Sequence, residues 1–520
     1  MTDQISDGAS PRGPGLTPGH DDLVEAAGHP VGAGVIKPGY DPRLTNEDLA
    51  PLRNQTWSSY NFFAFWMSDV HSVGGYLTAG SLFALGLVAW QVLVALLIGI
   101  GIVYLLCNLV ARPSQATGTP YPVVCRSAFG VLGANVPAII RGLIAVAWYG
   151  IQTYLASASL VVVALKLWPG LAPWADADVH GFTGLSAVGW VAFALMWVLQ
   201  ALVFWKGMEA IRRFVDFCGP AVYVVMFLLA GYLVFQAGWS NIDLNLSDHV
   251  ITGWAVVPVM LTAIALVVSY FSGPMLNYGD FSRYGKSFAT VKRGNFLGLP
   301  VNFLVFAILV VLTAAATRPV FGELIDDPVQ TVARLDSTTA VVLGALTFMI
   351  ATIGINIVAN FVSPAFDFSN VNPQKISWRM GGMIAAVGSV LLTPWNLYSS
   401  PDVIHYTLDT LGAFIGPLYG VLIADYFLVK KQKIDVDAMY TLSPTGKYFF
   451  RGGYNPVAIA ATAVGAVLAM LLVLMGSSDV ASFSWFLGAG IAFVLHWMLT
   501  RRTEPPRTPR RESSDGGRVR

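Results

Sequence analysis

The stretch that decides the fold is NFFAFWMSDVHSVGGYLTAGSLF, residues 61–83. It is long and apolar enough to cross a bilayer, but its middle carries polar and small residues: Ser68, Asp69, His71, Ser72, Gly74 and Gly75. A charged residue at the bilayer centre costs roughly 2.5–3.5 kcal/mol on insertion scales, so such groups are kept where they line protein or water. The stretch therefore predicts a membrane span that is interrupted at mid-depth.

A second stretch, ALVVSYFSGPMLNYGDFSRYG at residues 265–285, shows the same kind of interruption. Proline has no backbone N–H, so Gly273-Pro274 is expected to break the ladder of helical hydrogen bonds and leave backbone groups free. A simple kink is the alternative for either stretch alone. Interruptions at two corresponding places favour discontinuous helices that supply a binding site near the midplane.

The composition agrees with a chain that lives in the bilayer. Of its 520 residues, 55% are hydrophobic and only 12% are charged. Apolar runs on the order of 20 residues cross a bilayer. About twelve such spans are predicted, near residues 57–80, 83–109, 137–165, 186–205, 217–237, 254–276, 297–316, 338–365, 380–394, 403–429, 455–476 and 482–499. The fold class is therefore an all-α polytopic membrane protein.

The two interrupted spans, the first and the sixth, stand five spans apart. An odd offset makes the second block run opposite to the first, which is typical of an inverted repeat. We expect five parts, which are an N-terminal tail (1–55), a first repeat with spans one to five (56–237), a second repeat with spans six to ten (238–429), spans eleven and twelve (430–500), and a basic C-terminal tail (501–520).

Charges in the predicted loops alternate in kind along the chain. If the N-terminus is cytoplasmic, the inward gaps carry most of the basic residues, among them Arg112, Arg212, Arg283, Lys430 and Lys447. The opposite gaps are mainly acidic, with Asp176, Asp243, Glu323, Asp326 and Asp327. The positive-inside rule then places both termini in the cytoplasm, in a protein of the inner (plasma) membrane.

Other classes of function lack their residues. An enzyme would need a nucleophile with a base, or a metal cluster, and no such set is visible. The three cysteines, Cys107, Cys125 and Cys218, have no paired spacing, so neither disulfides nor a metal site is expected. No cofactor and no catalytic residue is predicted. A channel or facilitative pore is the alternative class, although neither a repeated filter nor charged rings are visible.

Trp148 and Gln152 lie four residues apart in AWYGIQTYLAS (147–157) and share one helix face. The indole suits the face of a flat heterocycle, and the amide can donate and accept along its edge. Packing of Trp148 and helix–helix bonding by Gln152 are the alternative. Asn360 offers a second buried amide and Phe271 a second ring, so two rings and two amides could enclose one planar solute.

Several long stretches resemble the nucleobase:cation symporter-1 family, which includes permeases for uracil, cytosine, allantoin and hydantoins. They are RLTNEDLAPL (43–52), TPYPVVCRSAFGVLGANVPAIIRG (119–142) leading into WYGIQTY, NYGDFSRYGKS (277–287), ANFVSPAFD (359–367) and GPLYGVLIADYFLVKKQKI (416–434). The resemblance implies a LeuT-like fold of five plus five spans with broken helices one and six and two extra C-terminal helices.

The resemblance also implies roles for the site residues. It implies that Trp148 stacks on one face of the substrate, that Phe271 covers the other face, and that Gln152 and Asn360 bond the substrate's edge. Ser72 stands where several members have Gln or Asn in span one, and its short hydroxyl would need a bridging water.

The expected ion site departs from the family pattern. Sodium-coupled members place two hydroxyl residues in span eight, opposite carbonyls of span one, and here those positions are Gly354 and Ile355. A hard cation needs oxygen ligands, so only carbonyls near Ser68 and His71 remain. A proton is favoured over sodium, with Asp69 and His71 as its candidate carriers. A structural helix-breaking role for Asp69 and a satisfied interior position for His71 are the alternatives.

We therefore expect a secondary active importer, a cation symporter that works by alternating access on a planar nucleobase-like heterocycle. Uracil is the first choice, because its imide edge fits Gln152 and Asn360, and allantoin or a hydantoin is the alternative within the family. The expected partners are a small-molecule substrate and the lipid bilayer, with no nucleic acid. The chain is expected to be a monomer.

Overall fold

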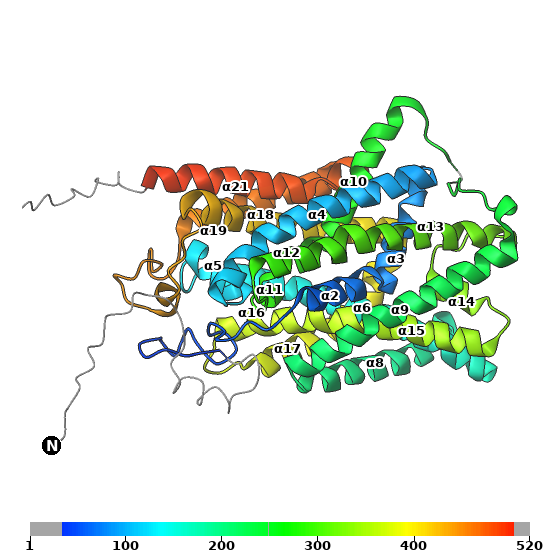
Figure 1. Cartoon of the computed structure of the whole chain (residues 1–520), viewed down its shortest axis with the longest axis horizontal. Coiled ribbons are helices and arrows are strands. Elements are labelled where there is room, and N and C mark those ends of the chain that lie inside the picture. Colours follow the sequence, from blue (N-terminus) through cyan, green and yellow to red (C-terminus); the bar gives the residue numbers. More distant parts are fainter. Residues whose placement is uncertain (1–33, 248, 504–520) are drawn as a thin grey trace, which may run out of the picture.

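The computed structural model describes residues 34–247 and 249–503, which form a bundle of long helices lying roughly side by side (Figure 1). The outer parts of the two expected tails, residues 1–33 and 504–520, lie outside the described residues. Within the described ranges the only sheet is a two-stranded antiparallel hairpin, β1 (Gly181–Phe182) and β2 (Leu185–Ser186).

Nine helical segments of the described residues are long and apolar enough to cross a membrane. They are α4 (Ala89–Thr117), α6 (Asn135–Leu167), α8 (Ala187–Trp205), α9 (Met208–Ala237), α10 (Val256–Leu276) with its preceding turn, α12 to α13 (Phe288–Phe321), α15 to α16 (Thr338–Val371), α18 with its final turn (Pro401–Val429), and α19 (Pro456–Met475). The other three predicted spans correspond to α2 with α3 (Ser59–Val70 and Val73–Ser81), α17 (Trp378–Leu391) and α21 (Ser484–Thr503). The shorter helices are α5 (Tyr121–Phe129), α7 (Ala177–His180), α11 (Gly279–Ser282), α14 (Pro328–Ala333) and α20 (Ser478–Ala481).

The interruption predicted in the first span is present, whereas the sixth span is interrupted after the predicted Gly273-Pro274 pair and not at it. The first span breaks at His71 and Ser72, between α2 and α3. In the sixth span α10 passes through Gly273-Pro274 and ends at Leu276, so the interruption lies at Asn277 and Tyr278, before α11. Pro274 lacks only the hydrogen bond that its own N–H would have donated. The helix continues for one more turn after Pro274, because Asn277 N–H donates to the Gly273 carbonyl at 3.3 Å.

One end of the bundle, which we call the basic end, carries the predicted basic gaps and the described part of the N-terminal tail (Figure 1). Residues 34–55 pack against this end, and Leu44 and Leu49 are buried there. The Arg283 guanidinium donates to the carbonyls of Asp48 (2.9 Å) and Ala50 (2.7 Å), which fixes the segment beside α11. The opposite end, the acidic end, carries α14 and the β hairpin.

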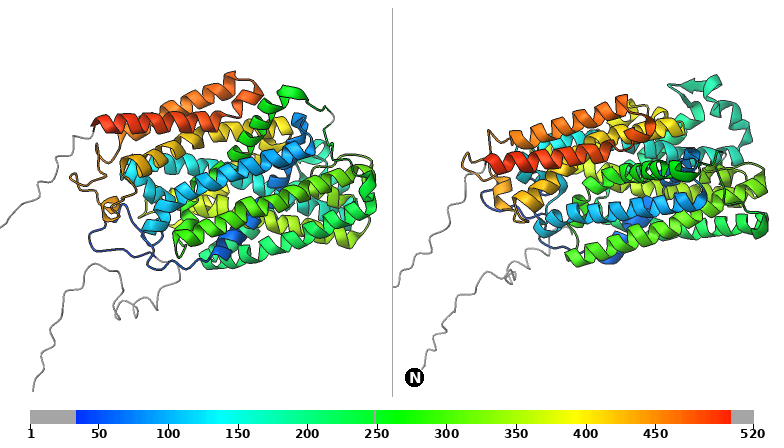
Figure 2. Two further views of the ribbon diagram at one scale, coloured as in Figure 1. Left: turned by 45° about the horizontal axis from the view of Figure 1, so that its top comes forward. Right: turned by 90° about the horizontal axis from the view of Figure 1, so that it is seen from above.

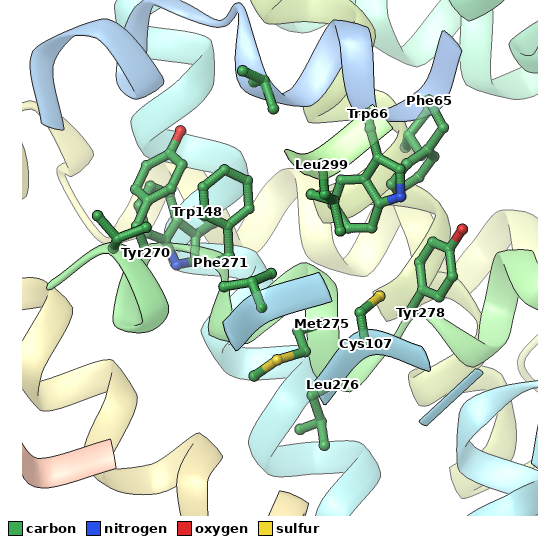
Figure 3. Packing of buried hydrophobic residues seen from close by; sticks show 14 of the residues in the cluster. Phe65, Trp66, Cys107, Trp148, Tyr270, Phe271, Met275, Leu276, Tyr278 and Leu299 are labelled. Atoms are coloured by element: carbon green, nitrogen blue, oxygen red, sulfur yellow. The ribbon is translucent and has the colours of Figure 1, made fainter. Parts of the chain in front are cut away.

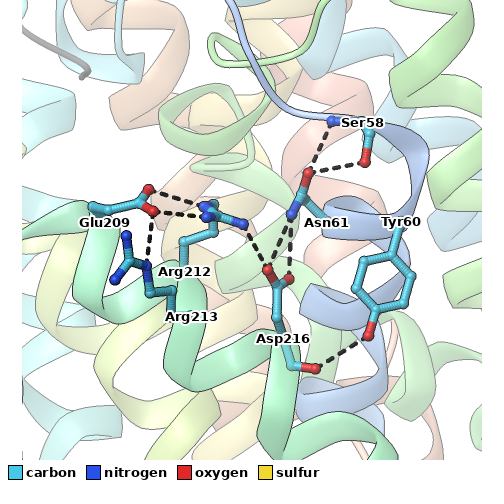
Figure 4. Close-up of polar contacts among 7 residues, drawn as sticks. All are labelled: Ser58, Tyr60, Asn61, Glu209, Arg212, Arg213 and Asp216. Atoms are coloured by element: carbon cyan, nitrogen blue, oxygen red, sulfur yellow. Dashed lines mark hydrogen bonds and ion pairs between the residues drawn. The ribbon is translucent and has the colours of Figure 1, made fainter.

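The start of α2 is anchored to α9 at the basic end (Figure 4). Asn61 Nδ2 donates to Asp216 Oδ2 at 3.2 Å, and Arg212 bridges Asp216 (2.8 Å) and Glu209 (2.7 Å). The Asn61 side chain also accepts a hydrogen bond from Ser58 N–H at 2.9 Å, which caps the helix. The first half of the interrupted span is therefore held to span five.

The last spans pack through a glycine face on α18. In the figures α19 and α21 run beside α18 along one side of the bundle (Figures 1 and 2). Gly412, Gly416 and Gly420 recur every fourth residue, and a Cβ at Gly416 or Gly420 would lie 2.3 Å from the Trp485 carbonyl oxygen or 2.1 Å from that of Ala489. Small residues at this spacing let membrane helices approach closely.

Replacing Gly420 by alanine is expected to lower the thermal stability of the purified protein, because backbone of α21 must move to make room. The matched control is Gly101→Ala in α4, where an added Cβ meets no described atom within 4 Å. We expect Gly420→Ala to lower the melting temperature by several degrees and Gly101→Ala to leave it unchanged or raised, because alanine favours helix. Equal melting temperatures for the two variants would contradict this packing.

Candidate functional site

The break in the first span exposes backbone amides at the start of α3, and two hydroxyls satisfy them. Ser72 Oγ accepts a hydrogen bond from Gly75 N–H at 3.1 Å, as an N-cap does. Thr352 Oγ1 of α15 accepts from Val73 N–H, also at 3.1 Å. Span eight is thereby bonded directly to the interruption of span one. Ser72, predicted as a substrate contact, is seen here as a helix cap whose hydroxyl also meets Tyr270 Oη at 3.3 Å.

Trp148 and Gln152 project from α6 toward that break. Trp148 is 5% exposed, so its indole lies in the protein interior and not against lipid. A Cβ at Gly74 would lie 3.0 Å from Gln152 Nε2 and 3.3 Å from Gln152 Oε1, so the missing side chain gives the amide its place beside α3. Gln152 Oε1 is buried without a hydrogen-bond partner among the described residues. The Gln152 side-chain oxygen is therefore available to accept a hydrogen bond from a ligand.

Tyr270 is the ring whose centroid lies nearer to that of Trp148, and it was not among the predicted site residues (Figure 3). The centroids of Trp148 and Tyr270 are 5.5 Å apart with planes at 89°, so the contact is edge to face. Phe271 lies next to Tyr270 (5.0 Å) and packs on Phe303 (5.7 Å). Phe271 as the second face of a ligand sandwich stays a prediction. Its neighbour Tyr270 was equally visible in the SYF triplet of span six.

Asn360 sits in a π turn, Val358–Val362, that interrupts span eight, and such turns are frequent at functional sites. Its Nδ2 donates to Asn356 Oδ1 at 3.1 Å. Asn356 in turn donates to Gln200 Oε1 (2.7 Å) and to Thr153 Oγ1 (3.0 Å). This chain of amides, unseen in the sequence, orients Asn360 and ties it to the residue next to Gln152.

Of the two positions predicted for an ion site, Gly354 faces the first span, and neither Gly354 nor Ile355 offers a side-chain oxygen. A Cβ at Gly354 would lie 3.8 Å from Ser68 Cβ and 3.5 Å from Cys218 Cβ, so spans one, five and eight meet here. Ile355 is buried. Ser68 Oγ is buried and, within the described ranges, has no hydrogen-bond partner. Residues 34–247 and 249–503 contain no group of three or more His, Cys, Asp or Glu side chains suited to a metal ion.

The two candidate proton carriers have different surroundings. His71 is enclosed by the rings of Tyr223 (4.3 Å) and Phe306 (5.3 Å), and its Nδ1 lies 3.1 Å from Tyr76 Oη. Asp69 is buried, and in the part of the chain that the structure describes its Oδ2 has no hydrogen-bond partner. His71 Nε2 likewise has no hydrogen-bond partner among the described residues, so the two groups differ in the aromatic rings that pack on His71 and not in the number of open atoms.

An interrupted span in a helical membrane bundle, with ring and amide side chains beside the interruption, is typical of secondary transporters with discontinuous helices. Comparisons with known proteins also indicate a transporter. The chain is 33% identical to the allantoin permease of Bacillus subtilis (strain 168), over 92% of this chain and 97% of that protein. It is 31% identical to the purine-uracil permease of Arabidopsis thaliana, over 82% of this chain and 71% of that protein.

A solved structure shares the fold. It is that of Mhp1, described as a nucleobase-cation-symport-1 family transporter in a closed conformation with bromovinylhydantoin bound, and it matches with a TM-score of 0.72 at 22% identity, covering 88% of this chain and 96% of that one. A Na⁺-coupled sialic acid symporter matches with a TM-score of 0.58 at 13% identity, covering 87% and 91% of the two chains.

The chain belongs to the family of permeases for cytosine/purines, uracil, thiamine and allantoin, which it matches over residues 50–498. The predicted resemblance, the all-α LeuT-like fold and the expectation of a transporter instead of an enzyme are thereby confirmed. The roles of the individual site residues stay predictions.

Thr352→Val tests whether the hydroxyl of span eight holds the break in span one. The change keeps the side-chain shape and leaves the buried Val73 N–H without its acceptor, at a cost of about 1–3 kcal/mol. We expect a lower melting temperature and at least a tenfold loss of transport. The control is Thr347→Val on the same helix, because Thr347 is half-buried and its hydroxyl donates within that helix, to the Leu343 carbonyl at 2.7 Å. If both variants behave like the wild type, the bond is unimportant.

Proposed function

We propose that the chain is a secondary active importer that carries a planar cyclic acyl-urea across the membrane by alternating access. The observation that carries the proposal is the buried Gln152 amide, which lies beside the interruption of span one with a free acceptor, one turn from the Trp148 ring. A ring with an N–C(=O)–N edge offers a flat face to the indole and donors and acceptors to the amide. Residues 56–237 and 238–429 would be the two inverted repeats of this carrier.

The substrate is proposed within a narrow chemical class. Uracil, allantoin and hydantoins all present an acyl-urea edge, and Gln152 and Asn360 could bond that edge in each of them. The relative named as an allantoin permease matches nearly the full chain at 33% identity, which favours allantoin over uracil, the first choice from the sequence. We therefore propose allantoin as the first compound to assay and uracil as the second.

Uptake of labelled allantoin into proteoliposomes, in competition with unlabelled uracil, cytosine and a hydantoin, tests the substrate class. Saturable uptake that acyl-ureas inhibit is the expected result. Trp148→Leu should reduce kcat/KM at least tenfold, because a stacked ring contributes about 1–3 kcal/mol per base-like ligand. Trp254→Leu is the control, since Trp254 is 91% exposed and has no place in the site. Flux that rises linearly without saturation would instead indicate a pore.

We propose that the coupling cation is a proton. Neither Gly354 nor Ile355 has a side-chain oxygen, so the predicted cation position between spans one and eight lacks both of the hydroxyl ligands that a hard cation would use there. The buried Asp69, with an open oxygen in the interrupted span, is the proposed proton carrier. His71 is less suited, because aromatic rings and Tyr76 fill its surroundings.

Removing sodium at constant pH should leave uptake unchanged, and a proton gradient imposed without sodium should drive accumulation. A sharper version restores the missing ligands with the double variant Gly354→Ser, Ile355→Thr. The neighbours of an added Cβ at Gly354 stand at 3.5 Å or more, so a serine fits there, and sodium stimulation of uptake is expected to appear. Sodium dependence in the unchanged protein would contradict the assignment.

We further propose a plasma-membrane location with the basic end and both termini in the cytoplasm, as the positive-inside rule indicates. The protein is proposed to act as a monomer.

A further inference from the structure

A second set of polar side chains lies on the three helices that bear the proposed substrate contacts. Arg141 precedes Trp148 on α6, Asp367 on α16 (Ser363–Val371) follows Asn360 along span eight, and Asn277 follows Phe271 at the end of α10. Each is about two helical turns, or roughly 10 Å, nearer the basic end than its partner. The three helices therefore carry polar groups at two levels along the proposed transport path.

We call the lower set the inner cluster, and its members are Arg141, Asp367, Asn277, Asp280 and Tyr121. Asn277 Nδ2 donates to Asp280 Oδ2 (3.3 Å) and to Asp367 Oδ2 (3.2 Å), so one amide bridges two carboxylates. Asp280 Oδ1 accepts from Tyr121 N–H at 2.8 Å.

Arg141 belongs to α6 and Tyr121 to α5. Arg141 Nη2 donates weakly to the Ala359 carbonyl (3.4 Å), and its guanidinium stands beside Gly273, where a Cβ would lie 3.5 Å from Nη2. All five side chains of the inner cluster are at most 1% exposed.

This cluster holds several unused hydrogen-bonding atoms. Five atoms of the inner cluster are buried with no partner among residues 34–247 and 249–503: Arg141 Nε, Arg141 Nη1, Asp367 Oδ1, Asn277 Oδ1 and Tyr121 Oη. Leaving a buried polar group unpaired costs free energy, so such a concentration needs an explanation. Bound water is the ordinary one.

The unused atoms also have the pattern that an acyl-urea needs. Arg141 Nε and Nη1 are unpartnered donors on different edges of the planar guanidinium, and either can donate to a carbonyl oxygen. Asp367 Oδ1 and Asn277 Oδ1 are acceptors for ring N–H groups. The central level, at Gln152 and Asn360, offers the same mixture of donors and acceptors on the same helices.

We propose that the inner cluster is a second, transient binding site for the cyclic acyl-urea, occupied as the substrate leaves the central site toward the basic end. The inference rests on the proposed function. In this sequence of events the substrate exchanges its bonds to Gln152 and Asn360 for bonds to Arg141, Asp367 and Asn277. The carbonyl accepts from Arg141, and the ring N–H groups donate to Asp367 and Asn277.

A native cysteine reports on this site. Cys125 is buried on α5, one helical turn from Tyr121 and on the same helix face. In a full-length Cys107→Ala, Cys218→Ala background that retains uptake, Cys125 is the one thiol for N-ethylmaleimide. We expect millimolar allantoin to slow its alkylation in proteoliposomes at least threefold. Trp148→Leu should keep this protection, because the inner cluster does not use the indole.

Asp367→Asn and Arg141→Gln should abolish the protection. Tyr121→Phe is the mild variant, because it removes only a hydroxyl that has no partner among the described residues, and it should weaken the protection. Protection that disappears in Trp148→Leu, or that persists in Asp367→Asn and Tyr121→Phe, would overturn the inner site and leave the cluster as hydrated structure.

If allantoin and uracil neither enter the liposomes nor compete, the proposed function itself has failed. Intact uptake without protection of Cys125 refutes the inner site alone.

Discussion

The interrupted backbone at His71 and Ser72 is the constraint on which the rest of the site depends. Inside a bilayer every free amide and carbonyl must find a partner in the protein, because no water is there to replace one. The amides of Val73 and Gly75 find theirs in the hydroxyls of Thr352 and Ser72. The break is thereby tied to span eight, and Gly74 is held where the Gln152 amide can approach it.

The helix α6 links the levels of the proposed path. It carries Arg141 in the inner cluster and Trp148 and Gln152 beside the break, and Thr153 Oγ1 accepts from the Asn356 amide of span eight. Trp148 also meets Tyr398 (6.1 Å), whose hydroxyl bonds Thr78 of α3 at 2.7 Å. On the side of the acidic end, the site is therefore bordered by span one and by the segment Pro394–Tyr398, which precedes α18. On the side of the basic end it is bordered by the inner cluster.

Much of the fold could be predicted, because hydropathy and loop charge are local properties of the sequence. Each of the twelve expected spans has a matching helical segment, and the first break was expected at the right residues. The second break lies at Asn277–Tyr278 because a helix tolerates one missing bond at Pro274.

The contacts between distant segments could not be predicted. Three such contacts depend on tertiary packing and leave no local pattern in the sequence. They are the bond between Thr352 and the Val73 amide, the bond between the Asn356 and Gln200 side chains, and the bond from Arg283 to the Ala50 carbonyl. Gln152 and Asn360 were recognisable because an amide is costly in a lipid-facing helix, and Trp148 was recognisable because it lies one turn from Gln152 on the same helix face.

The most direct measurement of the central claim is a cryo-electron microscopy map of the protein in lipid nanodiscs with saturating allantoin. The account predicts a ring-shaped density against the indole of Trp148, with its polar edge within hydrogen-bonding distance of Gln152 and Asn360. Density bound elsewhere in the bundle while these three side chains keep their present contacts would contradict it.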